Sequence, residues 1–121
     1  MHKKSTHSSG ISIYYNPDCS KAKKAMAYAR SLSRDVFTLE YSKARQTATQ
    51  WRELLDQLSL RPKDILDKSK EYYQQNIRGR EFQDEDWLNV LINNPGLIRS
   101  PIAVRGDRAV MLDNPTDIYK V

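Results

Sequence analysis

The amino-acid sequence predicts an α/β fold whose sheet contains both parallel and antiparallel strands. Near the N-terminus, two short apolar runs flank a segment with helical periodicity, a pattern typical of a parallel strand–helix–strand unit. Near the C-terminus, two further apolar runs flank a Gly-Asp turn, which is typical of an antiparallel hairpin. Helical segments between these two parts complete an α/β sheet of mixed direction.

The first strand and helix are predicted from a change of pattern at residue 16. Residues 11–15 (ISIYY) form an apolar-rich run that Asn16-Pro17-Asp18 ends, as expected for a strand that enters a turn. From Ser20 onward, small and apolar residues recur at helical spacing, at Ala22, Ala25, Met26, Ala29 and Leu32. Asp35–Leu39 (DVFTL) then predicts the second strand of the parallel pair.

A block of helices is predicted between the two pairs of strands. Thr47 and Gln50 have the spacing of a capping box, and the helix that follows carries its apolar side chains on one face, at Trp51, Leu54, Leu55 and Leu58. Pro62 suits the first turn of a short helix. Further along, Asp84 is a candidate N-cap for a helix that presents Trp87 inward. We expect packing roles for both tryptophans.

The segment 68–82 is polar and gives no clear periodicity. It contains Tyr72 and Tyr73, the one pair of adjacent aromatic residues that we expect to be partly exposed, and therefore a candidate partner surface. The C-terminal hairpin is predicted from Pro101–Val104 and Arg108–Leu112 around the Gly106-Asp107 turn. Asn114-Pro115-Thr116 then opens a final helical stub.

Length and charge limit the function classes. A chain of 121 residues fits one domain, which we place over residues 11–121 behind a disordered polar tail, residues 1–10. Residues 1–34 carry a net charge of +6 and the remainder −1. A basic segment without interleaved aromatic residues is only a weak indication of nucleic-acid binding, so we do not expect a nucleic-acid partner. No apolar run is long enough to span a membrane.

The single cysteine, Cys19, is the main candidate for chemistry. It cannot form an internal disulfide, and with no secretory segment at the N-terminus we expect a cytoplasmic protein. The predicted helix N-terminus at Cys19, with Lys21, Lys23 and Lys24 nearby, favours the reactive thiolate form. The alternative is an inert cysteine that packs as a small hydrophobic residue. His2 and His7 lack a third ligand, and we predict no metal site.

Three motifs in order resemble the glutathione/glutaredoxin-linked arsenate reductase (ArsC) family. Residues 13–23 (IYYNPDCSKAK) are similar to its strand, Tyr-x-Asn-Pro-x-Cys turn and helix. Leu60–Lys68 resembles its short helical segment, and residues 94–104 (NPGLIRSPIAV) resemble its Asn-Pro-x-Leu-x-x-Arg-Pro-Ile-Val stretch. The resemblance spans about residues 11–115 and implies a thioredoxin-like fold with a helical insertion between its two halves.

The resemblance also implies roles for individual residues. Cys19 is the implied nucleophile, and its thiolate is stabilised by backbone N–H groups from Ser20 onward and by Lys21 and Lys23. Arg99 is a candidate anion ligand, and Pro101 is the implied cis-proline beside the cysteine. The implied reductant is glutathione or a glutaredoxin, with no bound cofactor.

The sequence departs from the family at the positions that bind arsenate. ArsC enzymes use three arginines, because guanidinium groups bind tetrahedral oxyanions through paired hydrogen bonds. Aligned by the motifs, these positions hold Asp67, Ser100 and Asn114. Arg99 stands one place from Ser100, but adjacent strand residues point to opposite sides. The sequence therefore argues against efficient arsenate reduction.

The sequence is also compatible with a second function. Spx-type regulators, a branch of the same superfamily, bind RNA polymerase and use a Cys-x-x-Cys redox switch. Ala22 occupies the position of the second cysteine, so no such intramolecular switch forms here. The alternative to an arsenate reductase-like thiol oxidoreductase is thus a non-catalytic or redox-sensing regulatory protein that binds a protein partner on the same scaffold.

Overall fold

The computed structural model describes residues 10–121, so the predicted tail lies outside the described residues except for Gly10. The chain forms two compact units. The first, which we call the sheet unit, comprises the described residues up to Ala44 together with Ser100–Val121. The second, the insertion unit, comprises Arg45–Arg99. Within the described residues, no helix is both long and apolar enough to cross a membrane.

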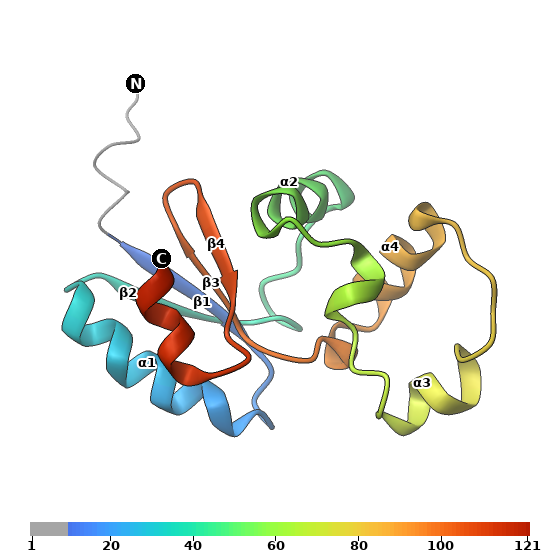
Figure 1. Ribbon diagram of the computed structural model, residues 1–121, viewed down its shortest axis with the longest axis horizontal. Coiled ribbons are helices and arrows are strands. Elements are labelled where there is room, and N and C mark those ends of the chain that lie inside the picture. Colours follow the sequence, from blue (N-terminus) through green and yellow to red (C-terminus); the bar gives the residue numbers. More distant parts are fainter. Residues whose placement is uncertain (1–9) are drawn as a thin grey trace. The chain divides into compact units, whose positions relative to one another are not determined.

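The sheet unit contains all four strands of the sheet (Figure 1). Its elements are β1 (Ile11–Tyr15), α1 (Ser20–Leu32), β2 (Val36–Glu40), β3 (Ile102–Arg105), β4 (Arg108–Met111) and the 3-10 helix η4 (Pro115–Lys120). The strand order is β2-β1-β3-β4, with β1 parallel to β2 and antiparallel to β3, which pairs with β4 in the hairpin. The predicted mixed α/β sheet is confirmed.

Strand register brings several chain segments to one edge of the sheet. Tyr15 pairs with Glu40 at the ends of the parallel strands, and Ile102 pairs with both Tyr14 and Met111. The carboxyl ends of β1, β2 and β4 therefore meet the amino end of β3. The segments that follow or precede these strands at this edge include Cys19. The Gly106-Asp107 turn of the hairpin lies at the opposite edge.

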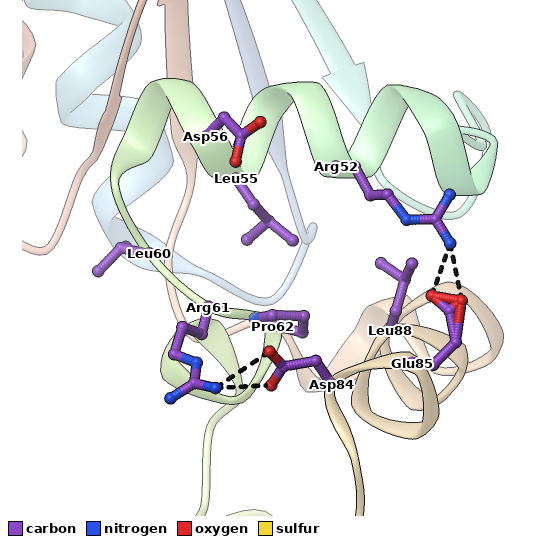
Figure 2. Close-up of a pocket in the computed structure, with 9 residues that line it drawn as sticks. All are labelled: Arg52, Leu55, Asp56, Leu60, Arg61, Pro62, Asp84, Glu85 and Leu88. Carbon is purple, nitrogen blue, oxygen red and sulfur yellow. Dashed lines mark hydrogen bonds and ion pairs between the residues drawn. The ribbon is translucent and has the colours of Figure 1, made fainter.

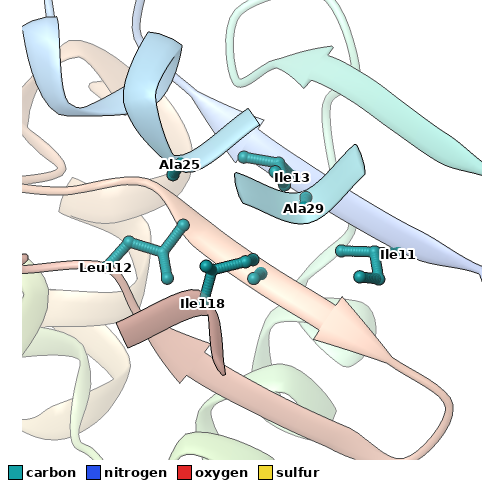
Figure 3. Packing of buried hydrophobic residues seen from close by; sticks show 7 residues of the cluster. Ile11, Ile13, Ala25, Ala29, Leu112 and Ile118 are labelled. Atoms are coloured by element: carbon teal, nitrogen blue, oxygen red, sulfur yellow. The ribbon is translucent and has the colours of Figure 1, made fainter. Parts of the chain in front are cut away.

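One face of the sheet is covered by α1 and η4. Figure 3 shows the side chains that fill this layer: Ile11, Ile13, Ala25, Ala29, Leu112 and Ile118. The inner face of α1 is lined by alanines, so the helix backbone approaches the strands closely while the branched residues of β1 supply most of the apolar volume. This core fixes α1, and therefore its N-terminus, against the carboxyl end of β1.

The insertion unit is helical. Its elements are α2 (Ala48–Leu58), η2 (Pro62–Ile65), α3 (Glu71–Asn76), α4 (Asp84–Asn93) and η3 (Pro95–Leu97). The capping box predicted at Thr47 and Gln50 is confirmed, because the Gln50 backbone N–H donates to Thr47 Oγ1 and the Thr47 backbone N–H donates to Gln50 Oε1. The N-cap of α4 is Gln83 rather than Asp84, and Asp86 closes that capping box.

The prediction that Tyr72 and Tyr73 form a partly exposed pair is wrong. Tyr72 is exposed, but Tyr73 is buried and stacks on Trp87 with ring centroids 6.4 Å apart. The two are neighbours in α3, so their side chains point about 100° apart around the helix axis. Trp51 and Trp87 are both buried, which confirms their packing roles.

The prediction of a cis-proline at Pro101 is also wrong. Every peptide bond of the described residues is trans, including the one between Ser100 and Pro101. In this form the Ser100 carbonyl accepts a hydrogen bond from the Tyr41 hydroxyl at 2.9 Å, and the Pro101 carbonyl accepts one from the Leu112 N–H at 2.8 Å. Because both flanking carbonyls are satisfied and trans is the lower-energy isomer, nothing here favours the cis form.

Candidate thiol site at the strand ends

Cys19 is the N-cap residue of α1, as the sequence predicted. Its backbone is extended, its N–H donates to the Asn16 carbonyl at 3.0 Å, and its carbonyl accepts from the Ala22 N–H at 3.3 Å. The Cys19 side chain makes no capping hydrogen bond to this helix, and the residue is partly exposed. The turn after β1 therefore delivers the sulfur to the positive end of a 13-residue helix.

Tyr41 is the buried aromatic residue of this edge. It directly follows β2, is 3% exposed, and stacks on Tyr14 with ring centroids 6.1 Å apart. Its N–H donates to the Tyr15 carbonyl at 2.9 Å, which continues the parallel ladder by one step. Its hydroxyl donates to the Ser100 carbonyl. Tyr41 thus ties the ends of β1 and β2 to the segment that enters β3.

The pKa of Tyr41 is raised well above its usual value. Burial is the main cause, followed by the negative charge of Cys19 and then by Tyr14, while a backbone hydrogen bond from Ile102 acts in the opposite direction. Burial also raises the pKa of Tyr14. Tyr41 is therefore a neutral hydrogen-bond donor at ordinary pH, and its hydroxyl lies close enough to Cys19 for the charge of a thiolate to act on it.

Ser100 lies at the centre of a polar chain at the same edge. Its side chain is buried, and its Oγ accepts a hydrogen bond from Lys21 Nζ at 3.2 Å. The same Oγ donates to Asp113 Oδ1 at 2.8 Å. Lys21 comes from the first turn of α1 and Asp113 from the segment after β4, so the hydroxyl joins two elements that are far apart in sequence.

The remaining predicted site residues occupy different surroundings. Ser20 and Lys23 are exposed in the first turn of α1. Pro101 is buried next to Ser100. Arg99 belongs to the insertion unit, where its N–H donates to the Ile65 carbonyl at 2.9 Å and its guanidinium donates to the Asp64 carbonyl.

Each of the three positions aligned with the family arginines takes part in a hydrogen bond. Asp67 Oδ1 accepts from the backbone N–H and the hydroxyl of Ser69, at 3.0 and 2.5 Å. Asn114 is the N-cap of η4, and its N–H donates to Asp117 Oδ2 at 3.0 Å. The hydrogen bonds of Asp67 and Asn114 are local, whereas Ser100 bonds to Lys21 and Asp113, which come from other elements of the sheet unit.

A second candidate site is a cleft of about 320 Å³ in the insertion unit. Figure 2 shows its lining residues, Arg52, Leu55, Asp56, Leu60, Arg61, Pro62, Asp84, Glu85 and Leu88. Two ion pairs lie on different sides of the cleft, Arg52–Glu85 at 2.6 Å and Arg61–Asp84 at 3.0 Å, and apolar side chains lie between them. The lining contains no cysteine, serine or histidine. In the described part of the chain, no cluster of side chains is suited to bind a metal.

Tyr41 and Asp113 are the site residues that sequence reasoning missed. A signal for Tyr41 was present, because it follows the second of two parallel strands and the carboxyl ends of such strands lie at the same edge as Cys19. Asp113 follows the hairpin in the same way. To predict that either residue lies near Cys19, the register of the strands must be known, and apolar patterning alone does not determine it.

Comparison with known proteins places this arrangement in a family. The model of the ArsC family matches residues 14–121, a range that includes Cys19, Tyr41, Ser100 and Asp113. The chain belongs to the ArsC family.

Several known proteins are similar to most of the chain. It is 24% identical to the uncharacterised protein YfgD of Escherichia coli strain K12, over 92% of this chain and 95% of that protein. It is 25% identical to an arsenate reductase of Yersinia enterocolitica, over 79% of this chain and 69% of the relative. The solved structure of an arsenate reductase from Vibrio cholerae superposes with a TM-score of 0.83 at 22% identity, covering 93% of this chain and 97% of that one. This likeness confirms the thioredoxin-like ArsC fold.

Proposed function

We propose that this ArsC-family chain is an arsenate reductase-like thiol oxidoreductase in which Cys19 is the single nucleophile. The observation that carries the proposal is the position of the cysteine: it is partly exposed at the N-terminus of α1, on the edge of the sheet where β1, β2 and β4 end and β3 begins. A helix N-terminus presents unpaired N–H groups and the positive end of its dipole, which attract anions, and the thiolate is the reactive form of cysteine.

The reaction has two steps that regenerate the cysteine. The Cys19 thiolate attacks one sulfur of a disulfide, a new S–S bond forms, and the other half leaves as a thiolate. A second thiol, from glutathione or a glutaredoxin, then attacks the mixed disulfide and releases Cys19 as a thiolate. One disulfide is exchanged for another, and the chain itself is unchanged.

Arsenate is a poor fit to this site. Its reduction requires cations that neutralise the oxyanion, and the positions aligned with the family arginines hold Asp67, Ser100 and Asn114, each engaged in a hydrogen bond. We expect slow arsenate turnover and faster exchange with disulfides.

The test is the reaction of the reduced chain with oxidised glutathione, followed by intact-mass analysis. The proposal predicts the mass of one glutathionyl group on Cys19, its removal by reduced glutathione with glutaredoxin, and no adduct in Cys19→Ser. The circular dichroism spectrum of the variant serves as the control for folding. The proposal is overturned if the native chain forms no adduct and Cys19 is labelled only after unfolding, because the cysteine is then inert in the folded chain.

A second candidate is a regulatory or interaction protein on the same scaffold. It is favoured by the hydrogen bonds of Asp67, Ser100 and Asn114, because a scaffold that lost the oxyanion site can use those positions for structural hydrogen bonds. Ala22 excludes a Cys-x-x-Cys switch, so sensing would proceed through a mixed disulfide of Cys19. Under this alternative, Cys19→Ser leaves binding of a non-covalent partner intact.

A further inference from the structure

A positive and a negative charge lie close together at the edge of the sheet that includes Cys19. They belong to Lys21 and Asp113, and the Ser100 hydroxyl lies between them. The Lys21 ammonium donates to Ser100 Oγ, and that hydroxyl donates to Asp113 Oδ1. A hydroxyl that accepts from a cation and donates to an anion gains from both charges. The charge of Lys21, the lysine nearest to Cys19 in sequence, is therefore offset by a carboxylate from the end of β4.

Asp113 is linked through Ser100 and Lys21 to the first turn of the helix that Cys19 caps. Lys21 lies two residues beyond the cysteine, in the first turn of the same helix. The Ser100 carbonyl accepts from the Tyr41 hydroxyl, whose pKa a negative charge on Cys19 would raise. Asp113 is exposed and Cys19 is partly exposed, so a reactant approaching the sulfur also meets the field of the carboxylate.

We propose that Asp113 is a specificity-determining residue of the Cys19 site: by offsetting Lys21, it disfavours anionic disulfides relative to cationic ones. This inference rests on the thiol–disulfide exchange proposed above. In every such reaction the Cys19 thiolate forms one S–S bond and the departing half leaves as a thiolate, so the steps are the same for probes of different charge.

The experiment compares cystamine, a dication, bis(2-hydroxyethyl) disulfide, which is neutral, and oxidised glutathione, a dianion. Rates of adduct formation on Cys19 are followed by intact mass, and each variant is scored by its ratio of the glutathione rate to the cystamine rate. We expect Asp113→Asn to raise this ratio about fivefold at low salt, from the Coulomb interaction of unit charges across a wet surface. The change should shrink in 1 M salt, where screening is strong.

Two matched variants separate charge from structure. Asp107→Asn makes the same change of net charge at the hairpin turn, on the opposite edge of the sheet, and should leave the ratio within about twofold of the native value because distant exposed charges are screened. Asp113→Glu keeps the carboxylate and should keep the native ratio.

The outcomes are distinguishable. An unchanged ratio in Asp113→Asn overturns the inference, and so does an equal shift in Asp107→Asn, which would reflect net charge alone. A shift in Asp113→Glu as large as that in Asp113→Asn would indicate a purely structural role and also overturn it. If Cys19 of the native chain reacts with none of the three probes, the proposed function itself fails.

Discussion

The two units of the chain use polar side chains differently. In the sheet unit, the polar contacts between elements are partly buried and link residues far apart in sequence. In the insertion unit, charged side chains form ion pairs on the surface, and aromatic side chains pack in the core. Tyr41 and Ser100 are buried, and their hydrogen bonds join three strand ends and a helix. In the insertion unit, the side chains of the Arg52–Glu85 pair are 51% and 63% exposed. Buried hydrogen bonds fix a geometry that can serve chemistry, while exposed ion pairs contribute little to stability.

The comparison predicts that the insertion unit depends most on Trp87. This side chain is buried, stacks on Tyr73, meets Phe82 edge-on at 5.0 Å, and lies under the Lys63 ammonium at 5.4 Å. Trp87→Ala should lower the free energy of unfolding by about 3–5 kcal/mol, because it removes a large buried ring and leaves a cavity. Urea titration followed by circular dichroism measures the change. Tyr72→Ala, on the exposed side of α3, is the control and should stay within about 0.5 kcal/mol.

The sheet unit should be sensitive to the loss of a single oxygen atom. Tyr41→Phe retains the ring stacked on Tyr14 but removes the hydroxyl that donates to the Ser100 carbonyl. We expect a loss of about 1–2 kcal/mol, because that buried carbonyl loses its donor. The same urea titration tests this, and a neutral effect would show that the hydroxyl is not needed to hold the strand ends.

Alkaline pH offers a second measurement on the same residue. The pKa of Tyr41 is raised in the folded chain, chiefly by burial, so folding favours the neutral phenol. Its contribution to stability is therefore fully present below the unfolded pKa of about 10 and is lost as the pH rises above it. Native stability should fall above pH 10 more steeply than that of Tyr41→Phe. Parallel curves for the two proteins would contradict the assignment.

A smaller effect is expected at the N-terminus of α2. Thr47→Ala removes one half of the capping box with Gln50 and should cost about 1 kcal/mol, since a first-turn N–H loses its acceptor. Thr49→Ala lies in the same turn, is exposed, and makes no capping contact, so it should be neutral or slightly stabilising. Equal losses in both variants would mean that the cap is not the cause.

The smallest effect should come from the surface ion pairs. Arg52→Ala breaks the 2.6 Å pair with Glu85 and should change stability by about 0.5 kcal/mol or less, with the difference shrinking as salt is added. If Arg52→Ala lowered the free energy of unfolding as much as Trp87→Ala does, surface ion pairs would stabilise this unit as strongly as aromatic packing, which would contradict the prediction.

Local signals were sufficient for most of the fold. The strand–turn–helix around Cys19 and the capping box at Thr47 are decided by neighbouring residues, and both were predicted correctly. Tyr41 and Asp113 escaped prediction because their importance depends on which strand ends meet, a long-range property. Pro101 shows the opposite case, since a family expectation was overridden by the trans bond in this chain.

The two tryptophans of the chain, Trp51 and Trp87, both lie in the insertion unit, and the one cysteine lies in the sheet unit. Each unit therefore carries its own intrinsic reporter. Tryptophan fluorescence follows the opening of the insertion unit alone, while the rate at which the thiol is labelled follows the edge of the sheet. Recording both across one denaturant series would reveal whether the two units melt together or one after the other, without adding a probe to either.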